Sequence, residues 1–371
     1  MKKIAIIIGT RPEAIKIAAL YNHMLGSRNV TPLLVTTGQH ASLLDETLAS
    51  LEIKPHLSLH IMEPNQSLTS VTSRLHSEIG KVLDNLEPDF ILVQGDTTTA
   101  LVAALEGFYR KIPVGHLEAG LRTENKMEPF PEEVNRRLIS VVSSLNFAPT
   151  DEASRCLAIE NVDPEIIHVT GNTGIDTLLD TTKKLKNSRA SEKLSHLFST
   201  GPNRLVLVTC HRRESFGKPI LEIMDALARS AKAHPDVKFI FPVHPNPNVV
   251  SIVKESLGQI DNIDLVEPLN YVDLVALLSK VELIVTDSGG LQEEAPSIGK
   301  RTIVMREVTE RPEAVEAGYS ELVGTSSNKI FESINRNLLK PNRDLLPSTI
   351  FGDGKSSAKV VDLITRYLAP K

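Results

Sequence analysis

Short, almost uninterrupted apolar segments alternate with longer segments of helical periodicity along the chain. The apolar segments have the length of strands, and we expect strands at Ile4–Ile8, Pro32–Thr36, Phe90–Val93, Val114–Leu117, Leu205–Val208, Lys238–Pro242 and Leu283–Thr286. The segments between them predict helices at Ala14–Leu25, Leu68–Leu86, Thr98–Tyr109, Glu132–Ser144, Ile220–His234 and Tyr271–Ser279. Because strands that are apolar on both faces need helices on both sides, this alternation predicts an α/β fold with parallel sheets.

The alternation restarts near Arg204, after a polar and charged stretch at residues 183–203. A chain of 371 residues is long enough for two domains that each bury a core. We therefore expect two doubly wound domains, with a boundary between residues 170 and 200.

Composition narrows the class of protein. The formal net charge is −5 and no basic tract is present, which argues against nucleic-acid binding. The two cysteines are too few for a disulfide framework or a tetrahedral metal site, and they fit a reducing compartment such as the cytoplasm. The N-terminal apolar run is too short for a signal peptide, and no segment is long enough to span a membrane.

Unusual polar clusters follow the predicted strands in both halves of the chain. They are Gly9-Thr10-Arg11, Gln39-His40, Gly95-Asp96, Glu118, His211-Arg212-Arg213, His244 and Asp287-Ser288-Gly289-Gly290. Ligands of open parallel sheets bind beyond the carboxyl ends of the strands, so we expect these groups to face one interdomain cleft. Turn chemistry explains any one cluster as well, but it is a poorer explanation for all of them.

Two clusters suit an anion. Thr10 and Glu13 have the spacing of a capping box, which places Arg11 and Lys16 beside a helix N-terminus. A capped helix with two solvated charges is the alternative. The paired glycines after Asp287 and Ser288 let phosphate oxygens approach backbone N–H groups, and Glu294 one turn later suits ribose hydroxyls.

Three carboxylates, Asp96, Glu118 and Glu132, are candidates for acid–base chemistry, because clustered carboxylates can hold different protonation states. The alternatives are helix capping for Asp96 and, for Glu132, helix-dipole stabilisation with an ion pair to Arg136. His116, His211 and His244 are more often structural when considered singly. Their scattered positions, without HExxH or CxxC spacing, predict no metal site.

The motifs taken together resemble a known family. They are, in chain order, GTRPEAIK from Gly9, QGDTTT from Gln94, HLEAGLRT from His116, PFPEEVNRR from Pro129, HRRESFG from His211, PVHPNP from Pro242, TDSGGLQEEAPS from Thr286 and TERPEA from Thr309. This series is similar to that of the bacterial non-hydrolysing UDP-N-acetylglucosamine 2-epimerases and spans nearly the whole chain.

The resemblance implies a GT-B-like fold of two Rossmann-like domains. Residues 1–170 would carry the acid–base carboxylates, residues 171–352 would bind the nucleotide, and residues 353–371 would form a helix returning to the first domain. It also implies a cytoplasmic homodimer that uses no cofactor or metal. The implied reaction interconverts UDP-N-acetylglucosamine and UDP-N-acetylmannosamine by eliminating UDP and re-adding it to 2-acetamidoglucal.

The resemblance also assigns roles residue by residue. Asp96, Glu118 and Glu132 become acid–base candidates, assisted by His211 near the diphosphate. The substrate-binding candidates are Arg11, Lys16, Arg136, His244, Ser288, Gly289, Gly290, Glu294 and Arg311. Gln39, His40 and Arg74 are candidates for an allosteric site, although the run after His40 departs from the family's pattern there.

Two other functions fit parts of this pattern. A GT-B glycosyltransferase that uses a UDP-sugar would share the nucleotide site, but it needs one base rather than a cluster of carboxylates. A non-catalytic sensor of nucleotide sugars would be recognised by loss of a carboxylate, and all three are present.

Overall fold

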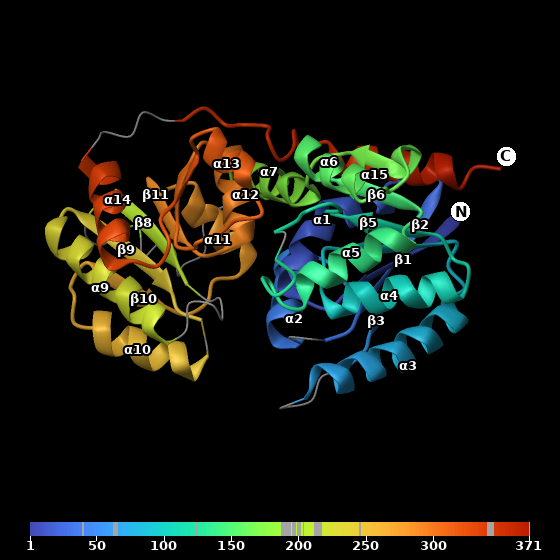
Figure 1. The fold of residues 1–371 in the computed structure, drawn as a ribbon, viewed down its shortest axis with the longest axis horizontal. Helices are drawn as coiled ribbons and strands as arrows, with labels where there is room; N and C mark the ends of the chain where they lie inside the picture. Colours follow the sequence, from blue (N-terminus) through green and yellow to red (C-terminus); the bar gives the residue numbers. More distant parts are fainter. Residues whose placement is uncertain are drawn as a thin grey trace. The chain divides into compact units, whose positions relative to one another are not determined.

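The computed structural model describes residues 1–38, 41–61, 66–123, 125–186, 194, 198, 202, 204–210, 217–244, 246–339 and 345–370. These residues form two compact units. The first comprises Met1–Asp180 and Phe351–Lys371, and the second comprises Thr181–Ile350. Each unit has its own parallel sheet with helices packed on it (Figure 1).

The first unit is built on a seven-stranded parallel sheet of order β3-β2-β1-β4-β5-β6-β7. Its strands are β1 (Lys2–Ile8), β2 (Val30–Thr36), β3 (Leu57–Ser58), β4 (Phe90–Gln94), β5 (Val114–Leu117), β6 (Leu145–Ala148) and β7 (Ile167–Val169). Its helices are α1 (Arg11–Leu25), α2 (Ala41–Ser50), α3 (Leu68–Leu86), α4 (Thr98–Tyr109), α5 (Glu132–Val142), α6 (Asp151–Ile159), the 3₁₀ helix η1 (Pro164–Ile166), the first part of α7 (Thr173–Lys186) and α15 (Ser356–Tyr367).

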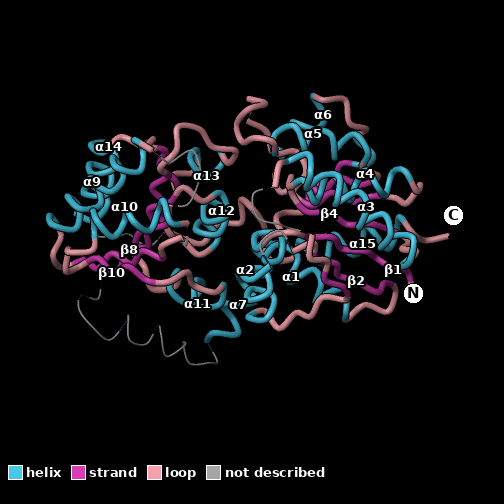
Figure 2. Tube along the Cα trace, turned by 90° about the horizontal axis from the view of Figure 1, so that it is seen from below, coloured by secondary structure: helices cyan, strands magenta, loops and turns pink. Residues whose placement is uncertain are grey.

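The second unit repeats the design with six parallel strands of order β10-β9-β8-β11-β12-β13. The strands are β8 (Arg204–Thr209), β9 (Val237–Pro242), β10 (Ile263–Val266), β11 (Leu283–Thr286), β12 (Arg301–Val304) and β13 (Ser320–Leu322). The helices are α9 (Lys218–Ala233), α10 (Pro247–Leu257), α11 (Tyr271–Leu278), α12 (Gly289–Ser297), α13 (Pro312–Glu316) and α14 (Ser327–Leu339). Figure 2 separates the strands and helices of both units by colour.

The central strands are buried on both faces, which explains their apolar sequences. Residues 4–8 of β1 and all of β4 are buried, and Ile91, Val93 and Val114 pack with Ile139 of α5. Burial of both faces is what an all-parallel sheet requires. The prediction of two α/β domains with parallel sheets is therefore confirmed.

Both sheets reverse their strand order at one point. The chain runs outward from β1 to β2 and β3, and then returns to place β4 on the other side of β1. The second sheet does the same between β8 and β11. Loops that leave the carboxyl ends of two such strands diverge, so this switch point is where open sheets bind ligands.

Several short strands were missing from the sequence prediction. β6, β7, β10 and β13 each contain a polar residue or only three residues, so no apolar run marks them. The helix expected to reach Ser144 ends at Val142, because Ser143 is already extended and β6 begins at Leu145.

The C-terminal segment belongs to the first unit. The Asp176 carboxylate of α7 accepts hydrogen bonds from the backbone N–H groups of Ser356 (3.2 Å) and Ser357 (2.6 Å) at the start of α15. The Tyr367 ring packs edge-on to Phe90, with centroids 6.0 Å apart. The division between the two units falls inside α7, after Asp180.

Within the described residues, none of the helices combines the length and apolar character that crossing a membrane requires.

Candidate active site

Three polar turns meet at the switch point of the first sheet. They follow β1 at Gly9 and Thr10, β4 at Gly95 and Asp96, and β5 at Glu118. Helices α1 and α4 begin directly after the first two turns, so their N-termini lie at the same edge of the sheet. These three turns therefore lie at one edge of the first sheet.

The buried Glu13 side chain links the turn after β1 to the turn after β4. Its carboxylate accepts hydrogen bonds from the N–H groups of Gly9 (2.9 Å) and Thr10 (2.7 Å) and from the Thr97 hydroxyl (2.8 Å). The side chain is only 2% exposed, and burial raises the pKa of its carboxyl. The capping box predicted from Thr10 and Glu13 is confirmed, but the sequence did not reveal that Glu13 also ties the start of α4 to that of α1.

Lys16 and Glu118 form an ion pair across the switch point. The Lys16 Nζ lies 2.5 Å from both carboxylate oxygens, and Gln94 Nε2 donates to the same carboxylate. The Lys16 side chain is 12% exposed and that of Glu118 is 8% exposed. Lys16 is therefore not a solvated charge, and the alternative of a capped helix with two solvated charges is wrong for this residue. Arg11, the first residue of α1, is half-buried.

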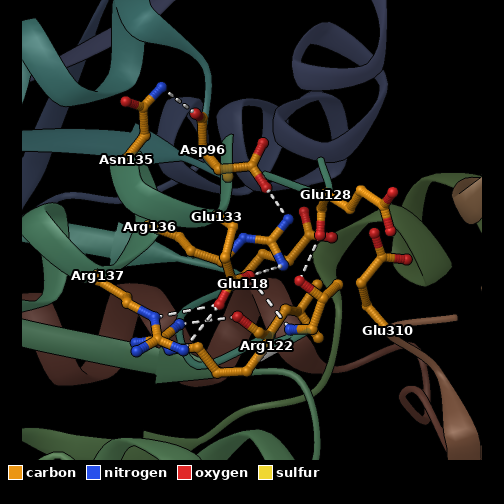
Figure 3. A network of polar contacts seen from close by, with 12 residues as sticks. Asp96, Glu118, Arg122, Glu128, Glu133, Asn135, Arg136, Arg137 and Glu310 are labelled. Carbon is orange, nitrogen blue, oxygen red and sulfur yellow. Dashed lines mark hydrogen bonds and ion pairs between the residues drawn. The ribbon is translucent and has the colours of Figure 1, made fainter. Parts of the chain in front are cut away.

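A second ion pair involves Asp96 and Arg136, as Figure 3 shows. Arg136 donates from one guanidinium nitrogen to Asp96 Oδ2 at 2.5 Å, and its other terminal nitrogen lies 3.3 Å from Glu133 Oε2. Glu133 is fully buried and also pairs with Arg137 at 3.0 Å. The capping alternative for Asp96 is wrong, because the N-cap of α4 is Thr97, whose hydroxyl accepts from the Ala100 N–H.

Glu132 opens α5, one turn before Arg136. It is partly buried and follows two cis peptide bonds, Glu128–Pro129 and Phe130–Pro131. A carboxylate in the first turn of a helix is favourably placed relative to the helix dipole.

His116 is buried within the first sheet and is not exposed alongside the carboxylates. It is a β5 residue with no exposed surface, and burial lowers the pKa of its imidazole to about 4. Its Nε2 lies 2.7 Å from the Gly95 carbonyl oxygen.

The second switch point is built on the N-terminus of α12. Ser288 is the N-cap, and its backbone N–H donates to the Thr286 hydroxyl at 2.9 Å. Gly289 and Gly290 form the first turn. A Cβ at Gly289 would lie 2.9 Å from an Arg311 guanidinium nitrogen, so only glycine lets that guanidinium lie against the helix start.

A buried ion network holds Arg311 in this place. Arg311 Nε donates to Glu293 Oε1 at 2.8 Å, and another guanidinium nitrogen donates to Glu310 Oε2 at 3.0 Å. Arg306 also donates to Glu310 at 2.9 Å. All four side chains are at most 7% exposed. The sequence marked Arg311 but not the two carboxylates that orient it.

The remaining candidates of the second unit lie near strand or helix ends. Glu294 accepts a hydrogen bond from the Tyr271 hydroxyl at 2.9 Å, and the Tyr271 ring is fully buried. His244 follows β9, and its Nδ1 accepts from the Asn246 N–H at 3.3 Å.

Three predicted residues, Gln39, His40 and His211, lie outside the described residues. Arg74, the third allosteric candidate, donates to the Ile61 carbonyl at 3.2 Å from helix α3. In the part of the chain that the structure describes, no group of three or more His, Cys, Asp or Glu side chains is arranged to hold a metal ion.

Comparison with known proteins decides the family. The sequence profile of the UDP-N-acetylglucosamine 2-epimerases matches residues 23–365. The chain belongs to this family. The UDP-N-acetylglucosamine 2-epimerase of Escherichia coli K12 is 42% identical over 368 residues, which cover 98% of each chain.

Solved structures of epimerases agree with this assignment. The Neisseria meningitidis enzyme, crystallised with UDP-N-acetylglucosamine, is 41% identical with a TM-score of 0.94 and covers 98% of this chain and 100% of its own. The S. aureus protein MnaA, solved with UDP, is 40% identical with a TM-score of 0.92 and covers 99% and 97%. The resemblance to the epimerase family and the GT-B-like class of fold are confirmed, and the relatives favour an epimerase over a glycosyltransferase.

Proposed function

We propose that this protein interconverts UDP-N-acetylglucosamine and UDP-N-acetylmannosamine by inverting carbon 2 of the sugar. The observation that carries the proposal is the pair of carboxylate–cation contacts, Lys16–Glu118 and Arg136–Asp96, at one switch point of a chain that belongs to the epimerase family. Inverting a carbon centre without a redox step needs groups that remove and return one proton, and carboxylates are suited to this work.

The chemistry proceeds by elimination and re-addition. The proton on carbon 2 becomes acidic as the bond from carbon 1 to the UDP oxygen breaks, because positive charge develops at carbon 1. A carboxylate accepts the proton, the C–H electron pair forms the double bond of 2-acetamidoglucal, and UDP leaves with the electron pair of the broken bond. Protonation of the opposite face of carbon 2 and return of UDP to carbon 1 give the epimer.

Asp96, Glu118 and Glu132 are the proposed acid and base groups, and His211 is proposed to assist near the diphosphate. Lys16 and Arg136 support this assignment, because each places a cation next to a carboxylate where charge changes during proton transfer. Arg11 is proposed as a further cationic contact to the departing diphosphate. No redox cofactor or metal enters these steps.

The second unit is proposed to bind the nucleotide. Ser288, Gly289 and Gly290 open helix α12, and Arg311 lies against this helix start. Helix N-termini with glycines suit phosphate groups, because N–H groups of the first turn have no acceptor within the helix and the helix dipole is positive there. Glu294 is proposed to contact the ribose hydroxyls, and His244 to contact the nucleotide.

We further propose that the protein works as a homodimer in the cytoplasm. Support comes from the implied properties of the family and, for the cytoplasm, from a chain with only two cysteines. Sedimentation equilibrium of the purified protein should give twice the chain mass; a monomer at micromolar concentration would contradict the dimer. Allosteric control through Gln39, His40 and Arg74 stays a prediction.

Proton NMR in deuterium oxide tests the reaction. Purified protein incubated with UDP-N-acetylglucosamine should produce the anomeric signals of the 2-epimer and replace the carbon 2 proton with deuterium in both sugars. A heat-inactivated sample is the control. Epimer that retains the carbon 2 proton quantitatively would exclude elimination with solvent exchange, and absence of epimer would exclude the proposed function.

A further inference from the structure

Two buried side chains that have no role in the chemistry above hold the peptide groups on either side of Asp96. We propose that His116 and Asn135 are positioning residues that fix the Gly95-Asp96 turn and thereby aim the Asp96 carboxylate. The kinetic part of this inference rests on the proposed function, in which Asp96 takes part in proton transfer.

Gly95, the residue before Asp96, is held by strand β5. The Gly95 N–H donates to the Leu117 carbonyl at 3.0 Å, and the Gly95 carbonyl lies 2.7 Å from His116 Nε2. Gly95 has a positive φ of 68°, a conformation that glycine adopts without strain. Both polar groups of this glycine are therefore tied to neighbouring residues of one strand, which leaves the turn little freedom.

The peptide group after Asp96 is fixed by helix α5. The Asn135 side-chain amide donates to the Asp96 carbonyl at 2.9 Å, and Figure 3 shows Asn135 reaching this carbonyl beside Arg136. The next residue of the same helix, Arg136, donates to the Asp96 carboxylate. Strand β5 and helix α5 thus hold the backbone of Asp96 from two sides while Arg136 contacts its side chain.

The chemistry of His116 suits a positioning role. A carbonyl oxygen only accepts, so Nε2 must carry the hydrogen in this contact. Among the described residues, buried Nδ1 has no hydrogen-bond partner, and the charged groups that act on the ring are Arg122, Glu118 and Arg136. Burial keeps the imidazole neutral at neutral pH, and the ring has no exposed surface with which to touch a substrate.

Matched variants of His116 separate positioning from chemistry. His116→Phe keeps an aromatic ring but removes the N–H that donates to the Gly95 carbonyl. Its kcat should fall about 10- to 100-fold, while its KM stays within about threefold of wild type. His116→Gln can return an N–H group near the position of Nε2, and it should restore kcat to within about threefold of wild type. The exposed His23→Gln is the control. A glutamine variant as slow as the phenylalanine variant would show that the imidazole itself is needed and overturn the proposal.

Asn135→Leu is the independent variant if His116→Phe fails to fold, as judged by circular dichroism. It removes the donor to the Asp96 carbonyl and should also lower kcat while KM stays within about threefold. A wild-type kcat in folded Asn135→Leu would remove Asn135 from the proposal.

A double-mutant cycle tests whether the effect passes through Asp96. Asp96→Asn combined with His116→Phe should be no more than about threefold slower than Asp96→Asn alone. The reason is that His116 acts by positioning the Asp96 carboxylate, which the first substitution has already removed. Losses that multiply would mean that His116 acts elsewhere.

NMR keeps this inference distinct from the proposed function. In ¹⁵N-labelled wild type, the His116 ring should show a hydrogen on Nε2 and no titration between pH 5.5 and 9. The ¹³Cγ resonance of Asp96 should move in His116→Phe and return in His116→Gln. If both NMR results are obtained but the protein has no epimerase activity, the positioning role of His116 is supported and the proposed function is excluded. An unmoved Asp96 resonance would refute the positioning whatever the activity.

Discussion

The two sheets reverse their strand order at equivalent points, between β1 and β4 in the first unit and between β8 and β11 in the second. The groups placed there differ. The first switch point carries Asp96 and Glu118, each paired with a cation, and their side chains are 26% and 8% exposed. The second carries a helix start formed by glycines, and its carboxylates Glu293 and Glu310 are buried under Arg311.

The difference teaches that one topology supports two chemistries. Carboxylates at the accessible edge suit proton transfer, whereas backbone N–H groups and an oriented guanidinium suit an anion. In the second unit the acidic groups serve to orient a cation, because they are neutralised and removed from water. The following experiments test this division between the two units.

The largest effect is expected from the carboxylates of the first unit. Asp96→Asn, Glu118→Gln and Glu132→Gln should each lower kcat at least about 100-fold, since each removes a group able to exchange a proton. Affinity for UDP, measured by calorimetry, should change far less, because the proposed nucleotide contacts, apart from Arg11, lie in the second unit. Any variant that stays within about threefold of the wild-type rate loses its chemical role.

A smaller effect, on binding, is expected in the second unit. The Cβ of Gly289→Ala would displace the Arg311 guanidinium, which Glu293 and Glu310 hold in place. UDP affinity should fall about tenfold, corresponding to roughly 1.4 kcal/mol for a weakened charge-assisted contact. Isothermal calorimetry measures the change. Alanine at Gly290, in the same helical turn, is the comparison variant, because among the described residues its Cβ would meet only the Ser288 hydroxyl, at 3.9 Å. Equal losses in both variants would point to the added methyl group at the helix start rather than to displacement of Arg311.

The buried histidine of the first unit predicts a dependence of stability on pH. The folded-state pKa of His116 is about 4, below its ordinary value of 6.5, so the unfolded chain binds more protons between these values. Stability should therefore fall as the pH falls, by about 1 kcal/mol between pH 7 and 5.5.

Scanning calorimetry of wild type and His116→Gln over this range measures that dependence. The variant should lose this part of the pH dependence, whereas the exposed His23→Gln should keep it. An unchanged pH dependence in His116→Gln would mean that the imidazole is not held neutral by burial.

The smallest effect concerns the C-terminal helix. Asp176→Ala removes the carboxylate that caps α15, which stabilises a helix start by about 1 kcal/mol. Amide hydrogen exchange in α15 should accelerate about fivefold, the factor that corresponds to this energy. Helix α14 of the second unit is the internal control, and equal acceleration there would contradict a local role for Asp176.

Local sequence patterns predicted most of the framework. The strand segments of β1, β4, β5, β8 and β11 were recognised because burial on both faces demands uninterrupted apolar residues. The positions of Asp96, Glu118 and Ser288 were recognised because they directly follow such strands. Short strands with polar residues, such as β6 with its buried Asn146, carry no such signal.

The sequence by itself determined the class of fold, the family and the residues that stand at the strand ends, because these depend on neighbours along the chain. The partner of each residue was decided only by the tertiary structure. Lys16 and Glu118 lie 102 residues apart, and Asp96 and Arg136 lie 40 apart. Strand order brings each pair together, and the sequence around either residue does not indicate which residue it will contact. The same holds for Glu13 and His116, whose burial beneath the turns depends on how the strands and helices around them pack.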